Sequence, residues 1–375
     1  MLLIGPGRGH NILPIIEELN HQELFKVDFF CHNLEFSQVF YSNINFIPYS
    51  SNFIFELKKH LKLLFFGKKY DILFIQGGMH HILLTLIYIL LIKSKKKIFC
   101  CWSNQIIDIA TTKSRAQIIA KLIFKKSDFV FLNWHSIKER FENNFPQWRH
   151  KAVLSLGGLH DSFFLPVTNI TESNFVKKFL EEIPDQNIIS FWPRSIIRAN
   201  RHDLVIEAIA ILKKMFPEIL ENFTLYLWGG NVEDKHYRLI IEKAILDNDL
   251  IKNIKIVDHP FVSFTDIRII EKRSDFFIQI SEHDILSTFI IEVMLQEKDV
   301  ILSNIRPYQC LNEFYNFNIL LVDNDPKIIS EEIKNKILNI NNQNKELLAT
   351  RKKICEENFK FSKNYPKLIE WMFSL

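Results

Sequence analysis

Two polar segments combine residue types that bind phosphorylated ligands. The first, FWPRSIIRANRHD at residues 191–203, carries three arginines between a predicted strand and a predicted helix. A guanidinium group donates two parallel hydrogen bonds and therefore matches the oxygens of a phosphate. We expect Arg194, Arg198 and Arg201 to hold a diphosphate at this junction. A solvent-exposed loop with hydrated arginines is the alternative.

The second polar segment, SEHDILSTFIIE at residues 281–292, follows the strand-like run FFIQI. A helix is predicted to begin near Ser287 or Thr288, and its first amide groups lack partners within the helix, so they are available to a pyrophosphate. Glu292 lies one turn into this helix among apolar neighbours, where a carboxylate requires a partner. We expect Glu292 to accept hydrogen bonds from two vicinal hydroxyls, such as those of a ribose. An ordinary helix glutamate is the alternative.

A glycine-rich turn, GPGRG at residues 5–9, lies between the first predicted strand and a predicted helix. Glycine lets the backbone approach a ligand closely, so Gly7 is a candidate for contact with a phosphate or a sugar. The spacing differs from the GxGxxG dinucleotide motif, and the second predicted strand ends at Cys31-His32-Asn33 without an acidic residue. NAD binding is therefore disfavoured, and a tight turn without a ligand is the alternative.

The elements that position these residues alternate between strand and helix. Strands are predicted at residues 2–4, 26–31, 45–47, 72–76, 97–101, 129–133, 152–155, 187–192, 224–228, 254–257, 276–280, 300–303 and 319–322. Helices are predicted at residues 12–19, 203–215, 236–248, 265–272, 289–297 and 327–339. This alternation, with nearly continuous apolar strands, predicts an α/β protein with parallel, doubly wound sheets.

The predicted domain boundary lies near Gly157-Gly158, where a turn-rich stretch begins. We predict two Rossmann-like domains, residues 1–158 and 159–358, whose parallel sheets face an interdomain cleft. Ligands bind at the carboxyl ends of parallel strands, which would line such a cleft. A last helix, about residues 359–375 with Pro366 in its path, is expected to pack back on the first domain.

Composition excludes several classes of protein. The chain has 375 residues, of which 47% are hydrophobic and 24% charged, as in ordinary globular proteins. Its five cysteines lack the spacing of a zinc site, and we expect them to be reduced in a cytoplasmic protein. No signal peptide is expected at the start. The longest apolar run, residues 82–92, is shorter than the roughly 20 residues of a membrane span, and it predicts a buried helix.

Positive charge is concentrated in the first part of the chain. Residues 1–150 have a net charge of +8, whereas the remainder has −4. In FELKKHLKLLFFGKK, residues 55–69, apolar residues and lysines recur at helical spacing, which is typical of a helix that lies on anionic lipid. A hydrated helix face is the alternative. Nucleic acid is not an expected partner, because no binding motif is present.

The spacing of Asp284 and Glu292 resembles the E-x7-E signature of retaining GT-B glycosyltransferases of family 4. The arginine-rich segment that continues into HDLVIEA resembles another donor-domain motif of these enzymes. Residues 157–166, GGLHDSFFLP, resemble their interdomain segment. The likeness covers residues 187–325 and, in the order of elements, residues 1–160.

This resemblance implies roles for single residues on the donor side. Arg194 would be the phosphate-binding arginine, Glu292 would hold the nucleotide ribose, and Asp284 would lie near the donor sugar. The sugar and the phosphates would be lined by Leu286, Ser287 and Thr288.

Two positions depart from the family pattern. Asn200 occupies the position of the family's lysine, so Arg198 or Arg201 would have to supply that charge. The acceptor-domain His-Gly is absent, and Trp102-Ser103-Asn104 occupies its place. The remaining acceptor-side candidates are His80, His81 and Ser103.

The resemblance implies a hexosyl or related glycosyltransferase that uses a nucleotide-sugar as substrate, with neither a cofactor nor a metal. A retaining transfer to a bacterial surface glycan or lipid-linked oligosaccharide is expected, at the inner face of the cell membrane. The alternatives are a GT-B sugar-nucleotide epimerase and a non-catalytic GT-B partner subunit.

Overall fold

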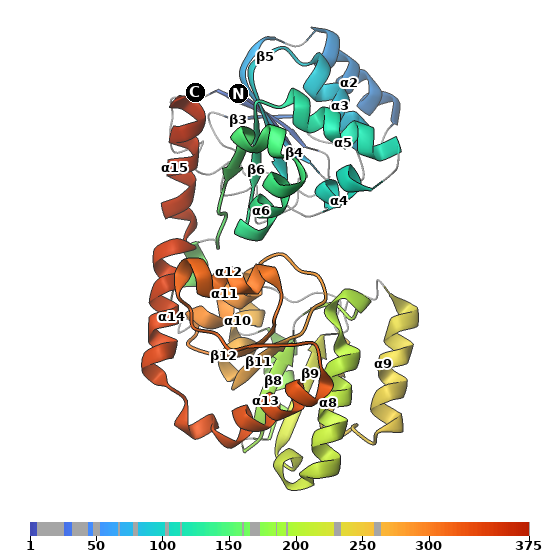
Figure 1. Cartoon of the computed structure of the whole chain (residues 1–375), viewed down its shortest axis with the longest axis vertical. Helices are drawn as coiled ribbons and strands as arrows, with labels where there is room; N and C mark the ends of the chain where they lie inside the picture. Colours follow the sequence, from blue (N-terminus) through green and yellow to red (C-terminus); the bar gives the residue numbers. More distant parts are fainter. Residues whose placement is uncertain are drawn as a thin grey trace. The chain divides into compact units, whose positions relative to one another are not determined.

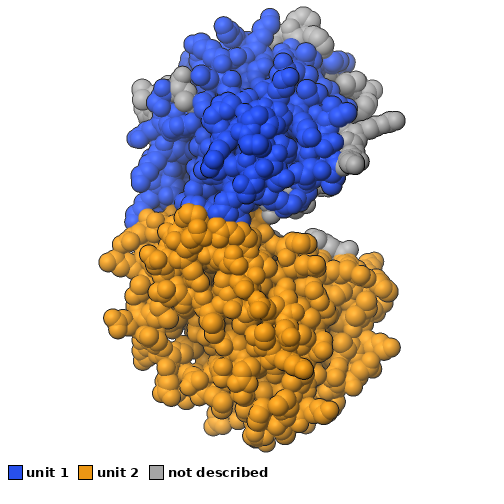
Figure 2. Space-filling view, in the orientation of Figure 1, with its two compact units in different colours: residues 1–161, 359–375 blue, residues 162–358 orange. Residues whose placement is uncertain are grey.

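The computed structural model describes most of the chain as two compact units. The described residues are 1–5, 26–31, 44–47, 53–66, 68–77, 82–101, 105–112, 115–159, 161–165, 173–184, 186–192, 194–228, 234–258 and 264–374. The predicted helix at 12–19 and the candidates Gly7, His80, His81 and Ser103 lie outside these ranges. Unit 1 comprises residues 1–161 and 359–375, and unit 2 comprises residues 162–358 (Figure 2).

Unit 1 is built on a seven-stranded parallel sheet with the strand order β3-β2-β1-β4-β5-β6-β7 (Figure 1). Its strands are β1 (Leu2–Gly5), β2 (Val27–Cys31), β3 (Ile44–Ile47), β4 (Tyr70–Gly77), β5 (Ser94–Cys101), β6 (Phe129–Leu132) and β7 (Ala152–Leu154). Its helices are α2 (Phe53–Phe66), α3 (Ile82–Leu91), α4 (Gln105–Thr111), α5 (Arg115–Lys126), α6 (His135–Asn144) and α15 (Phe361–Ser374). The apolar run at residues 72–75 is fully buried in β4, as expected of a strand covered on both faces.

Helix α15 joins unit 1 although it is the last element of the chain. Its side chains Phe361, Tyr365, Ile369 and Met372, at helical spacing, are buried in one apolar cluster with strands of the first sheet. The aromatic ring of Trp371 packs edge-on against Phe129 of β6, with 4.9 Å between the ring centroids. The end of the chain therefore contributes part of the core of the unit that contains its beginning.

Gly158 lies where the chain returns to this last segment. Its φ angle is +109°, a conformation that side chains rarely adopt. A Cβ atom at this position would lie 2.3 Å from the carbonyl oxygen of Phe359. The next amide, that of Leu159, donates a hydrogen bond of 2.7 Å to the same oxygen. Glycine is therefore required both by the backbone angle and by the close approach of the two segments.

Unit 2 is built on a six-stranded parallel sheet with the order β10-β9-β8-β11-β12-β13. Its strands are β8 (Ile188–Trp192), β9 (Phe223–Trp228), β10 (Ile254–Val257), β11 (Phe276–Gln279), β12 (Asp299–Ser303) and β13 (Leu321–Val322). Its helices are α7 (Asn174–Glu181), α8 (His202–Met215), α9 (Lys235–Asp247), α10 (Phe264–Arg273), α11 (Thr288–Leu295), α12 (Arg306–Tyr315), α13 (Pro326–Leu338) and α14 (Lys345–Asn358). The predicted α/β class with two parallel sheets is confirmed.

The prediction of a buried helix at residues 82–92 is wrong in one respect. The helix forms as α3, but Leu83 and Leu90 expose 57% and 47% of their surface. Its buried face carries Thr85, Leu86, Tyr88 and Ile89. An all-apolar sequence indicates burial on every side, whereas here one side packs on the unit and the other meets solvent. None of the helices in the described ranges is long and apolar enough to cross a bilayer.

Candidate functional site

The arginine-rich segment begins where β8 ends. The side chains at 189–192 in this strand are buried, and the chain then leaves the sheet at its carboxyl edge. Two hydrogen bonds fix the loop that follows. The buried Asn200 donates from Nδ2 to the carbonyl oxygen of Ser195 at 2.8 Å, and the amide of Glu282 donates to the carbonyl oxygen of Ala199 at 2.9 Å. The second bond ties this loop to the one that follows β11.

Asp284 lies in the loop after β11, the strand that neighbours β8 in the sheet. Its Oδ2 atom accepts hydrogen bonds from Gln279 Nε2 and from the Tyr308 hydroxyl, each at 2.6 Å. Its Oδ1 atom accepts from the amide of Ile285 at 2.7 Å. Tyr308 comes from α12 and is fully buried. The carboxylate of Asp284 is therefore held in one orientation by groups that do not depend on a ligand.

Arg194 meets the second polar segment at this edge of the sheet. Its Nη1 atom donates to Ser287 Oγ at 3.2 Å, and its Nη2 atom lies 3.5 Å from Asp284 Oδ1. One third of its side chain remains exposed. Adjacent parallel strands bring their carboxyl ends together, so residues 93 positions apart in the sequence meet here. The result is a partly exposed guanidinium group, oriented by a carboxylate.

The N-terminus of α11 completes this cluster. Ser287 is the N-cap residue of the helix, and Thr288 is its first residue. Within the described part of the chain, no hydrogen bond occupies the amide groups of Ser287, Thr288 and Phe289. Leu286 lies next to them, half-buried. Unpaired amides and the positive end of a helix dipole favour a bound anion, and Arg194 adds a formal charge at the same place.

Glu292 is almost fully buried in α11. Burial raises the pKa of its carboxyl to about 7, against the opposing effects of a hydrogen bond from Thr288, the charge of Arg268 and a hydrogen bond with Glu271. Arg268 and Glu271 both belong to α10. The buried carboxylate thus has partners within the protein, and the sequence pattern gave no indication of these.

The other two arginines of the segment are paired elsewhere. Arg198 lies 3.7 Å from the carboxylate of Asp234, and two-thirds of its side chain is exposed. Arg201 donates from Nη2 to Asp203 at 3.0 Å and adopts a left-handed conformation as the N-cap of α8. The structure therefore places Arg194 with Asp284 and Ser287, and it places Arg198 and Arg201 beside carboxylates at the starts of α8 and α9.

Comparisons with known proteins give matches in structure alone. No protein-family model matches the sequence, and no curated protein matches it. A glycosyltransferase from Rickettsia africae has a TM-score of 0.72 at 16% sequence identity, over 99% of this chain and 97% of that one. Anabaena Alr3699/HepE, solved in complex with UDP and glucose, has a TM-score of 0.73 at 13% identity, over 100% and 99%. Sucrose-phosphate synthase from Thermosynechococcus elongatus has a TM-score of 0.69 at 13% identity, over 100% and 98%.

The chain has the GT-B fold. The resemblance to GT-B glycosyltransferases that the spacing of Asp284 and Glu292 predicts is thus confirmed at the level of structure. In this GT-B protein, the cluster formed by Arg194, Asp284 and Ser287 lies at the carboxyl edge of the sheet of unit 2. The sequence did not predict three residues of this region, Tyr308, Gln279 and Glu271, because no motif connects them with the residues that they contact.

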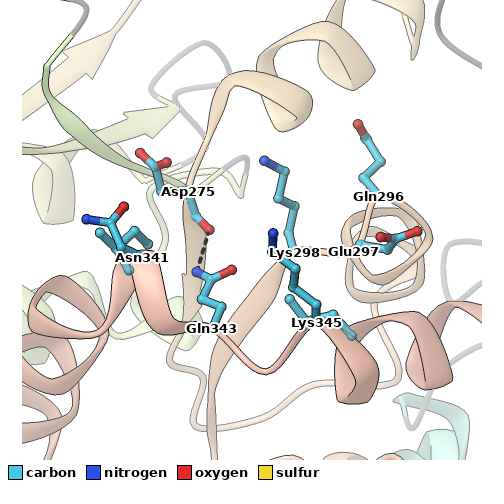
Figure 3. A pocket seen from close by; sticks show the side chains of 9 residues that line it. Asp275, Gln296, Glu297, Lys298, Asn341, Gln343 and Lys345 are labelled. Carbon is cyan, nitrogen blue, oxygen red and sulfur yellow. Dashed lines mark hydrogen bonds between the residues drawn. The ribbon is translucent and has the colours of Figure 1, made fainter.

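A separate pocket of the GT-B protein lies at the other end of the same sheet. Its volume is about 440 Å³, and it is lined by Asp275, Gln296, Glu297, Lys298, Ile340, Asn341, Gln343, Lys345 and Leu348 (Figure 3). Asp275 immediately precedes β11, whereas the arginine cluster follows that strand. Gln343 spans part of the pocket by donating to the carbonyl oxygen of Asp275 at 3.5 Å. Its wall contains two carboxylates, Asp275 and Glu297, and two lysines, Lys298 and Lys345, so the pocket has no dominant charge.

Proposed function

We propose that this chain is a retaining glycosyltransferase that transfers a sugar from a nucleoside-diphosphate sugar to a hydroxyl of a bacterial surface glycan or lipid-linked oligosaccharide. The observation that carries the proposal is the contact of Arg194 with Ser287 at the N-terminus of α11, beside Asp284, in a protein with the GT-B fold. The complexes of HepE with UDP and with UDP-glucose support a nucleotide-sugar as donor.

Arg194 and the first amides of α11 would stabilise the departing diphosphate. Negative charge grows on the leaving group as the sugar–phosphate bond breaks, and donors that are already oriented stabilise that charge without further reorganisation. Asp284 keeps the guanidinium oriented and would lie near the donor sugar. Glu292 would accept hydrogen bonds from the ribose hydroxyls. The acceptor hydroxyl would attack from the face that the leaving group vacates, so positioning and charge supply the catalysis.

The acceptor side is assigned to unit 1, at an anionic membrane surface. Helices α2, α3 and α5 lie side by side in this unit (Figure 1). The exposed side of α3 carries Leu83, Leu90 and Leu91, and the exposed side of α5 carries Ile118 with Lys121. Neither α3 nor α5 contains an acidic residue. Exposed leucines beside Lys121, on two helices without acidic residues, favour contact with anionic lipid.

The membrane contact is testable with vesicles. The protein should sediment with vesicles that contain phosphatidylglycerol and remain in solution with phosphatidylcholine vesicles. Replacing Leu83 and Leu90 by serine should reduce sedimentation, whereas the same change at Leu239 and Leu246, exposed leucines of α9 in unit 2, should not. Equal sedimentation of both double variants would contradict the assignment of this face.

The donor proposal is testable with a panel of nucleotides and nucleotide-sugars. UDP, GDP, ADP and CMP are tested by thermal shift, and the corresponding nucleotide-sugars are tested for slow hydrolysis. A shift with one nucleotide, and hydrolysis of its sugar derivative, is the expected result. Formation of an epimer without an acceptor would favour the epimerase alternative. The absence of any shift would exclude both enzymes and favour a non-catalytic partner subunit.

A further inference from the structure

Two buried glutamates meet between α10 and α11. Glu271 of α10 has no exposed surface, and Glu292 of α11 exposes 8%. Gln296 follows Glu292 by one helical turn and donates from Nε2 to Glu271 Oε2. Glu271 therefore lies against the side of α11 that carries Glu292. Its other oxygen, Oε1, has no donor among the described groups. Two carboxylates form a hydrogen bond only when one of them carries a proton.

The surroundings decide which carboxyl holds that proton. Burial, followed by the nearby charge of Glu292, raises the pKa of Glu271 well above its ordinary value. The pKa of Glu292 rises less, to about 7, because the Thr288 hydrogen bond, the Arg268 charge and the hydrogen bond with Glu271 all favour its ionised form. Glu271 has no exposed surface, whereas Glu292 keeps 8% exposed and has the Thr288 hydroxyl as a partner, so ionisation costs more at Glu271. The shared proton is therefore placed on Glu271, which donates to the carboxylate of Glu292.

Arg268 supplies the compensating positive charge from the same helix. Its guanidinium group donates to the carbonyl oxygens of Ser162 and Leu165, at 2.9 and 2.5 Å. These bonds hold the guanidinium group in place. Its charge lies close enough to both glutamates to lower the pKa of each carboxyl, which partly offsets the effect of burial. Among the residues that the structure describes, the charged groups that act on Glu292 are thus Glu271 and Arg268, both from α10.

We propose that Glu271 is a positioning residue of the donor site: its carboxylic acid donates to Glu292 and keeps that side chain oriented and ionised, so that Glu292 accepts hydrogen bonds from both vicinal hydroxyls of the nucleotide ribose. This inference rests on the proposed function, because Glu292 has a ribose to bind only if the chain binds a nucleotide. Two buried glutamates are costly to a fold even when they are paired, and an apolar pair of similar volume would join α10 to α11 equally well or better. A role in ligand binding accounts for the acid at this position.

The test compares two ribose chemistries in variants of Glu271. Calorimetry measures the Kd of UDP and of 2′-deoxy-UDP, which lacks one of the two hydroxyls. Glu271→Leu removes the donor, whereas Glu271→Gln keeps an N–H donor and an oxygen that accepts from Gln296. Glu332→Gln, at a buried glutamate of α13, is the matched control. Thermal unfolding of every variant is measured alongside.

Glu271→Leu should weaken UDP binding by about tenfold or more, the effect of losing a hydrogen bond to a charged group. It should weaken 2′-deoxy-UDP binding less, so that the preference for the ribonucleotide falls. Glu271→Gln and the control should keep that preference within about threefold, because both leave a hydrogen-bond donor facing Glu292. The melting temperature of Glu271→Leu should fall, because Gln296 and Glu292 lose a buried partner, so binding is measured at a temperature where every variant is folded.

Three outcomes count against the account, and they are distinguishable. If Glu271→Leu weakens both nucleotides equally, or neither, Glu271 does not act through the ribose and the inference is wrong. If Glu271→Gln loses the preference as fully as Glu271→Leu, hydrogen-bond donation is not its role. If the unaltered protein binds neither UDP nor any other diphosphate of the panel, the proposed function itself fails. Where another diphosphate binds, it and its own 2′-deoxy form replace the uridine pair.

Discussion

His202, the first residue of α8, makes the stability of unit 2 depend on pH in a predictable direction. Its ring is fully buried and stacks on Trp192 with 4.2 Å between the centroids. Burial lowers the pKa of this imidazole from 6.5 to about 3, against the smaller opposing effect of Asp203. We predict that His202→Phe, which keeps an aromatic ring against Trp192, removes the resulting sensitivity to acid.

The expected size follows from the two pKa values of this imidazole. Below pH 6.5 the unfolded chain binds a proton at His202 that the folded chain does not bind, so the free energy of unfolding falls as the pH falls. The slope approaches about 1.4 kcal/mol per pH unit, which gives a loss of about 2 kcal/mol between pH 7 and pH 5. The buried carboxyls of Glu271 and Glu292 act in the opposite sense, because their raised pKa values make the folded chain bind protons first.

Comparison of the variant with the unaltered protein isolates the histidine, since both contain the two glutamates. Urea unfolding at pH 7 and pH 5, analysed for the transition of unit 2, measures the two free energies. The variant should be more stable at pH 5, relative to the unaltered protein, by about 2 kcal/mol more than at pH 7. The same difference at both pH values would show that His202 becomes protonated in the folded chain, and the reasoning from its burial would be refuted.

Three further predictions concern the site and its support. Tyr308→Phe removes one of the hydrogen bonds to the carboxylate of Asp284, and it should slow sugar-nucleotide hydrolysis by about tenfold or more while the fold persists; an unchanged rate would contradict the orienting role of the tyrosine. Binding of UDP should weaken as the pH falls below about 7, because Glu292 then takes up a proton and accepts fewer hydrogen bonds, and calorimetry with 2′-deoxy-UDP should show a smaller change. Arg351→Leu removes one partner of Asp299 from a buried ion pair, and it should lower the free energy of unfolding, measured by urea titration, by about 3 kcal/mol or more. A loss below about 1 kcal/mol would show that the ion pair contributes little to stability.

The strands could be predicted because both sheets are parallel and their inner strands are buried on both faces. Every predicted strand corresponds to an observed one. Short apolar runs such as ILFI (residues 72–75) and FVFL (residues 129–132) have the length and composition of buried strands and are too short for a helix. The sequence did not predict helix α14. Its buried side chains are Leu348, Arg351 and Cys355, so the helix lacks a clear periodic pattern of apolar residues. The sequence of α3 is apolar throughout, so it predicts the helix but does not indicate which side of it meets solvent.

The candidate site could be predicted in part, for a topological reason. The resemblance implies donor-side roles for both Arg194 and Asp284. The carboxyl ends of neighbouring parallel strands meet, and the structure has Arg194 after β8 within 3.5 Å of Asp284 after β11. Tyr308 and Glu271 lie on α12 and α10, where helix packing decides which side chain faces the site. That packing depends on contacts across the whole unit, and no short pattern in the sequence encodes it.

The central claim is that Arg194 binds the diphosphate of a nucleotide donor, and calorimetry with UDP and uridine tests it most directly. Arg194→Ala should weaken the binding of UDP by about tenfold or more and leave the binding of uridine unchanged, because only UDP carries the phosphates that the guanidinium would contact. Arg198→Ala, the matched control on the same loop, removes an arginine that pairs with Asp234 and should change neither affinity by more than about threefold. Equal weakening of UDP by the two variants, or no weakening by Arg194→Ala, would contradict the account.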